Sequence, residues 1–180
     1  MDRLIEKYAH KLFVQGLVEK DAPLFGALET EVFWNRKGSE TEKLERVFEL
    51  LNINSLLFSK PAEPYKTIID FLSKSSGGAI YPQDSETRTF LHDLPVSDDF
   101  TAEAVVRALK SRKCVIMPGR GIVTFGTVSP EQAFVVYSSV CFACFVKFFS
   151  DYRLHVEEGI ITGDEQKAFD RAEQFVKPLP

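Results

Sequence analysis

The longest apolar run of the chain, from Ala133 to Phe149, limits the possible folds more than any other feature of the sequence. Its 17 residues, which include a lysine and two serines, fall short of the ~20 that a helix needs to cross a bilayer. Ser129-Pro130-Glu131 precedes the run, and proline is favoured at the first position of a helix. We therefore expect a buried helix from Ser129 to about Asp151, in a protein without a membrane segment.

Length and composition narrow the class of protein. The chain has 180 residues, the length of one ordinary domain, so we expect residues 1–180 to form a single domain. Apolar residues make up 44% and charged residues 27%, which is typical of soluble globular proteins and argues against disorder. The net charge of −4 leaves no basic surplus for nucleic acid. The odd number of cysteines and the absence of a secretory leader favour a cytoplasmic location.

The remaining segments alternate between helical and strand patterns. Helical spacing is found in residues 2–19, 42–51, 65–72, 102–109 and 164–176, and strand patterns in residues 28–34, 55–58, 79–81, 113–117 and 122–125. We interpret Pro82 to Arg88 as a polar loop. The alternation predicts one α/β domain without internal repeats.

A stretch of about 45 residues from Leu91 to Phe134 resembles the second half of the class II aldolase/adducin domain. That family has a loop of the form n-H-G-v-v-v-w-G followed by t-l-e-e-A-f. This chain has R-G-I-V-T-F-G from Arg120 to Gly126, followed by Glu131-Gln132-Ala133-Phe134. The resemblance implies a three-layer α/β/α fold around a central mixed, mainly antiparallel sheet. It also implies a homo-oligomer, most simply a tetramer.

Enzymes of that family bind zinc through three histidines and use a nearby glutamate as acid and base. The resemblance places Glu63 at the position of the glutamate. It places Tyr81 and Gln83 at the two histidines of an H-x-H strand, and Arg120 at the third histidine. An arginine stays protonated in proteins and only donates hydrogen bonds, so it does not ligate a metal. The resemblance therefore implies a degenerate site with no metal and no cofactor.

Arg120 is the most informative of these positions, because a guanidinium could take over the positive charge of the zinc ion. Its planar fork binds a carboxylate or a phosphate at two points. In one interpretation, Tyr81, Gln83, Arg120 and Gly121 bind a small anionic ligand beside Glu63. In the other, Arg120 pairs with Glu63 and closes an inactive pocket.

Three functions follow from these interpretations. The first is a homologue without zinc that binds a small anionic metabolite or a protein partner. The second is an active aldolase-like lyase or epimerase on a small sugar phosphate or hydroxy acid, with Glu63 as acid/base and Arg120 holding the anion. The third is a structural interaction module like the adducin head. Whether the protein is an enzyme stays open at this point.

The pair Cys141-x-x-Cys144 lies within the apolar run, without a second pair or a preceding strand. Cysteines three residues apart on a helix share one face, and a buried cysteine behaves as a small apolar residue. We expect this pair to pack in the core.

Overall fold

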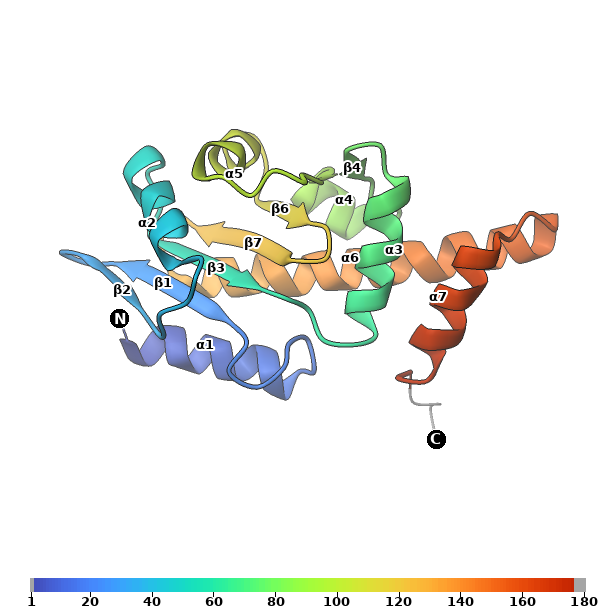
Figure 1. Cartoon of the computed structure of the whole chain (residues 1–180), viewed down its shortest axis with the longest axis horizontal. Helices are drawn as coiled ribbons and strands as arrows, with labels where there is room; N and C mark the ends of the chain where they lie inside the picture. The colour runs from blue at the N-terminus through green and yellow to red at the C-terminus, as the bar shows by residue number, and fades with distance from the viewer. Residues whose placement is uncertain (1, 177–180) are drawn as a thin grey trace.

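The computed structural model describes residues 2–176 (Figure 1). The helices are α1 (Asp2–Val14), α2 (Thr41–Leu50), α3 (Tyr65–Ser75), α4 (Ser85–Leu91), α5 (Ala102–Leu109), α6 (Pro130–Glu158) and α7 (Gly163–Glu173). The strands are β1 (Leu24–Leu28), β2 (Val32–Trp34), β3 (Ser55–Ser59), β4 (Ala79–Ile80), β5 (Leu94–Pro95), β6 (Cys114–Met117) and β7 (Gly121–Gly126).

The central sheet has five strands in the order β2-β1-β3-β7-β6, and all its neighbouring strands are antiparallel. Val96, directly after the small β4–β5 ribbon, adds a parallel bridge to Ile116 at the edge of the sheet. The sheet is therefore mixed and mainly antiparallel, as predicted.

Alternate side chains of the strands enter two separate apolar clusters, because successive residues of a strand point to opposite faces. In β6, Ile116 packs with α1, α3 and α6, whereas Val115 and Met117 pack with α2 and α5. In β3, Leu57 and Leu56 are divided in the same way. The two helical layers on the two faces of the sheet confirm the three-layer α/β/α fold.

Helix α6 is the core helix expected from the apolar run, and it is longer than expected. It has 29 residues and ends at Gly159, which adopts a left-handed conformation with φ of 71°. By length and composition it could cross a membrane, but half of its most apolar window is buried within the domain. Figure 1 shows α6 running along the length of the molecule, with α7 beside α3 at one end.

Two local predictions are wrong. The segment 28–34 is not one strand: β1 and β2 form a hairpin whose turn is closed by the N–H of Glu29 and the carbonyl of Glu31. The sequence of β1 does not show the alternation of apolar and polar residues that indicates a strand, because four of its five residues are buried. The expected loop from Pro82 to Arg88 contains most of α4, whose first turn is capped by the carboxylate of Asp84, which accepts from the N–H of Thr87 at 2.8 Å.

Candidate functional site

A cleft with a volume of about 940 Å³ lies between α3, α6, α7 and the strand β4. Most of the residues that line it have polar side chains. They are Thr67, Asp70, Lys74, Ser75, Ser76, Tyr81, Lys147, Asp151, His155, Thr162, Asp164, Glu165 and Lys167. The cleft therefore offers a ligand both polar groups and apolar surface.

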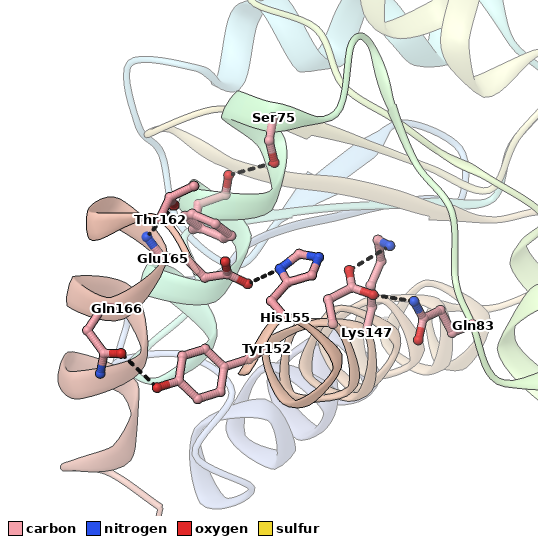
Figure 2. A network of polar contacts seen from close by, with 10 residues as sticks. Ser75, Gln83, Lys147, Tyr152, His155, Thr162, Glu165 and Gln166 are labelled. Carbon is pink, nitrogen blue, oxygen red and sulfur yellow. Dashed lines mark hydrogen bonds and ion pairs between the residues drawn. The ribbon is translucent and has the colours of Figure 1, made fainter. Parts of the chain in front are cut away.

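Most charges of this cleft are paired with one another (Figure 2). The carboxylate of Glu165, which is only 3% exposed, lies 2.7 Å from Nδ1 of His155 and joins α7 to α6. Asp151 pairs with Lys147 at 2.9 Å and accepts a hydrogen bond from the Gln83 amide. These contacts fix the positions of the side chains with which α6 and α7 line the cleft.

Glu63 lies directly before α3 and is bound at both of its carboxylate oxygens. Oε2 accepts from the N–H of Thr67 at 3.1 Å, and Oε1 accepts from the guanidinium of Arg171 at 2.9 and 3.0 Å. Burial by itself would raise the pKa of Glu63, but the hydrogen bonds from Thr67 and Arg171 outweigh it and hold the pKa below its ordinary value. The carboxylate is therefore ionised and engaged, and its partner is Arg171 rather than Arg120.

Arg120 lies in the tight turn between β6 and β7. Gly119 and Gly121 flank it with φ angles of 70° and 152°, a backbone that favours glycine. The N–H of Gly119 donates to the Asp70 carboxylate on α3 at 3.1 Å. A side chain at position 121 would place its Cβ 2.5 Å from the backbone oxygen of Ser59. The turn is thus held closely against β3 and α3.

The guanidinium of Arg120 is exposed and forms no ion pair with any carboxylate between residues 2 and 176. Its Cζ lies 6.0 Å from the centre of the Phe100 ring, and Nζ of Lys43 lies 4.5 Å from the same ring. Lys60 and Lys66 line a small hollow at the same turn. We call Lys43, Lys60, Lys66 and Arg120 the turn cluster.

The five residues predicted for the site fall into three groups. Tyr81, which is 66% exposed, lines the cleft, and Gln83 adjoins it through Asp151. Arg120 and Gly121 form the turn, and Glu63 lies at the N-terminal end of α3 with Arg171. The side chains do not contact one another across these groups, within the part of the chain that the structure describes.

Asp70 connects two of the groups, because it lines both the cleft and the hollow at the turn. Sequence reasoning missed Asp70, Arg171 and Lys43. Arg171 follows Glu63 by 108 residues, and no local pattern signals a pair of that separation. The sequence does indicate a role for Asp70 weakly, because a carboxylate among the apolar residues of α3 needs a hydrogen-bond or ionic partner nearby.

The fold resembles solved structures, although the sequence gives no match. No protein-family profile and no curated protein matches the chain. L-fuculose-1-phosphate aldolase from Thermus thermophilus superposes with a TM-score of 0.71 at 16% identity, over 89% of this chain and 97% of the other. The chain has the class II aldolase fold.

Two further structures agree with this assignment. YgbL from Klebsiella pneumoniae, described as a putative aldolase/epimerase/decarboxylase, superposes with a TM-score of 0.64 at 17% identity, over 82% of this chain and 89% of YgbL. An aldolase II superfamily protein from Pseudomonas syringae gives 0.59 at 11% identity, over 99% and 86% of the two chains. These structural similarities show that the proteins share a fold.

The donor set of this chain does not fit a zinc ion at the positions that the family resemblance indicates. Tyr81 and Gln83 are poor substitutes for histidines, and the third position holds a guanidinium, which repels a cation. Across residues 2–176, no three His, Cys, Asp or Glu side chains come together as a metal site would require. We therefore derive no chemical step through a metal.

Cys141 and Cys144 lie on the buried side of α6, and Cys114 lies in β6. All three thiols are free and buried. Burial raises the pKa of each thiol well above its ordinary value. A reactive cysteine requires the thiolate, so this environment agrees with core packing.

Proposed function

We propose that this class II aldolase-fold protein binds a small anionic metabolite through Arg120, without a zinc ion. The observation that carries the proposal is the state of Arg120, a guanidinium exposed on a rigid turn and paired with no carboxylate of residues 2–176. A free guanidinium fork on a fixed backbone is suited to a phosphate or a carboxylate, which it can bind at two points.

The neighbouring charges support an anion at this turn. Lys43 and Arg120 approach the same Phe100 ring, and Lys60 and Lys66 line the hollow beside the turn. Asp70 is the one carboxylate in the lining of the hollow, and it accepts from the N–H of Gly119. Glu63 lies 3.9 Å from Lys66 and is the second carboxylate near the turn. Four cations therefore outnumber two adjacent carboxylates, and a phosphate would reduce the mutual repulsion of the cations.

The state of Glu63 favours binding over catalysis. A general base must reach the proton that it removes, with a pKa near the working pH. Both oxygens of Glu63 are occupied, and its pKa is lowered. The alternative function, a lyase or epimerase with Glu63 as acid/base, requires this carboxylate to leave Arg171.

A melting experiment with defined probes tests the proposal. Inorganic phosphate, dihydroxyacetone phosphate and lactate are added at about 10 mM, and we expect at least one to raise the melting temperature by roughly 2 °C. Calorimetry then compares Arg120→Ala with the matched variant Arg107→Ala, which removes an exposed arginine from α5. We expect about tenfold weaker binding in the first variant and no change in the second.

Three results would overturn the proposal. The first is that no probe shifts the melting temperature, and the second is equal loss of binding in both arginine variants. The third is stoichiometric zinc, manganese or iron in untagged protein purified without chelators. Cleavage of a sugar phosphate that disappears in Glu63→Gln would replace the proposal by the lyase alternative.

We also propose a cytoplasmic homo-oligomer, with a tetramer as the simplest form. The exposed apolar side chain of Phe142 on α6, at 53%, supports an interface on that helix. Light scattering of the purified protein measures the assembly, and a monomer at all concentrations would contradict it. Neither nucleic acid nor a membrane is proposed as a partner.

A further inference from the structure

A second and smaller cavity lies at the other end of the β6–β7 hairpin. Its volume is about 330 Å³, within the range of small-molecule sites. Apolar walls come from Phe90 on α4, Phe125 on β7, and Val135 and Val136 on α6. Lys113, the residue directly before β6, is the one lysine or arginine in the lining.

The Lys113 ammonium group lies in an unusual environment for a cation. Its Nζ is 3.6 Å from the centre of the Phe90 ring, and it forms no ion pair with a carboxylate of residues 2–176. The aromatic face stabilises the charge, while burial lowers the pKa of the amine. The cation thus lies against an apolar wall without an anionic partner.

Two neutral polar side chains of the lining, Ser129 and Gln132, also offer donors to an acceptor. Oε1 of Gln132 accepts from the N–H of Val128 at 2.8 Å and from the Thr127 hydroxyl at 3.3 Å. The Nε2 group of Gln132 and the hydroxyl of Ser129 have no acceptor within the described chain. One cation and two neutral donors therefore surround the cavity.

Glu131 is the carboxylate of the lining, and it does not neutralise Lys113, since the two form no ion pair. Its charge acts instead on Tyr8 of α1. The pKa of Tyr8 is raised, first by burial and then by the proximity of Glu131. Lys113 therefore keeps an unmatched charge despite this neighbour.

From these observations we infer that the cavity is a binding site for a small monocarboxylic acid with an apolar body. The carboxylate would pair with Lys113, and the body would lie between Phe90, Phe125 and Val135. A monoanion suits a single cation, whereas a phosphate dianion would lose hydration among apolar walls without a second cation in compensation. Nothing in this inference depends on Arg120, because the site lies at the opposite end of the hairpin.

Isothermal calorimetry with phenylacetate tests the inference, with the neutral phenylacetamide as the matched probe. We expect phenylacetate to bind the unmodified protein, and phenylacetamide to bind at least about tenfold more weakly. Lys113→Met should weaken phenylacetate binding by about tenfold and leave phenylacetamide unchanged, because methionine keeps the apolar stem without the charge. Lys110→Met, an exposed lysine at the end of α5, and Arg120→Ala should leave both probes unchanged.

Val135→Trp provides a second variant that does not alter the charge. Its larger side chain should fill the cavity and abolish binding of both probes in a protein that melts within about 2 °C of the parent. The absence of phenylacetate binding at about 10 mM, or equal affinity for the acid and the amide, would overturn the inference. A Val135→Trp protein that changes its oligomeric state while neither probe binds the parent would identify the cavity as an interface between copies, and would overturn it too.

Discussion

The two ends of the β6–β7 hairpin have opposite characters although they belong to the same pair of strands. At the turn, the four cations of the turn cluster lie around a small hollow and the Phe100 ring. At the open end, Lys113 alone lies among aromatic and aliphatic walls. Under the two proposals, the number of cations and the degree of burial, rather than the presence of a cation, decide which anion each end would hold. An exposed cluster suits a multivalent, hydrated anion, and a lone half-buried ammonium suits a monoanion with an apolar body.

Among the changes made at one end of the hairpin only, Gly121→Ala at the turn should have the largest effect, which is a loss of stability. The new Cβ would lie 2.5 Å from the Ser59 carbonyl oxygen, and the residue would have to keep a positive φ. We expect a loss of about 3 kcal/mol in the free energy of unfolding, measured in urea. Gly119→Ala is the matched control because a Cβ at that position would have no heavy atom within 4 Å, and we expect about 1 kcal/mol. Equal losses would show that the close approach to β3 does not hold the turn.

Salt should have a smaller effect, and it should weaken anion binding more at the turn than at the open end of the hairpin. Exposed charges are screened strongly at high ionic strength, and half-buried ones are screened less. Raising sodium chloride from about 50 mM to about 500 mM should weaken phosphate binding at the turn by roughly tenfold. Phenylacetate binding should weaken by roughly twofold. Calorimetry at both salt concentrations measures the two ratios, and identical ratios would remove the distinction between the ends.

Arg171→Ala should give the smallest change, and its pH dependence tests the pairing of Glu63. We expect a loss of about 1 kcal/mol at neutral pH, because Arg171 is more than half exposed and solvent weakens the pair. The folded protein holds the pKa of Glu63 below that of the unfolded chain. The pair therefore stabilises the fold above the ordinary glutamate pKa of about 4.3, and this contribution disappears as the pH falls through the lowered pKa.

Urea unfolding at several pH values between about 7 and 3 follows the difference between the parent and Arg171→Ala. The difference should shrink toward the acid end. A constant difference would mean that Arg171 acts through packing alone. The freed carboxylate should also turn toward Lys66, which already lies 3.9 Å away, and weaken phosphate binding at the turn by roughly twofold without affecting phenylacetate.

Local periodicity in the sequence predicts one α/β domain, whereas the three layers were implied by the resemblance to the class II aldolase/adducin domain. The long apolar run from Ala133 to Phe149 predicts the core helix. Helix α4 was missed because it is short and largely polar, so that its signal lies mainly in the Asp84 cap. The first hairpin was missed because a strand buried on both faces shows no alternation.

The candidate site was predictable only where the signal was local. The glycines on either side of Arg120 indicate a turn that presents its side chain, and the structure has that turn. The pairing of Glu63 with Arg171 depends on how α7 packs against α3, which no spacing in the sequence encodes. The same holds for the cavity beside Lys113, because α4, β7 and α6 meet there only in the folded chain.

Labelling of the three buried thiols can report how often the layers of the domain separate. Cys141 and Cys144 lie on α6 and Cys114 on β6, so that no alkylating reagent reaches them while the sheet and its central helix stay together. The rate of labelling by iodoacetamide in native buffer would then equal the rate at which these layers separate, multiplied by the chance of capture before they close again. If a ligand at either end of the hairpin slows labelling of all three thiols equally, that ligand stabilises the whole core against opening.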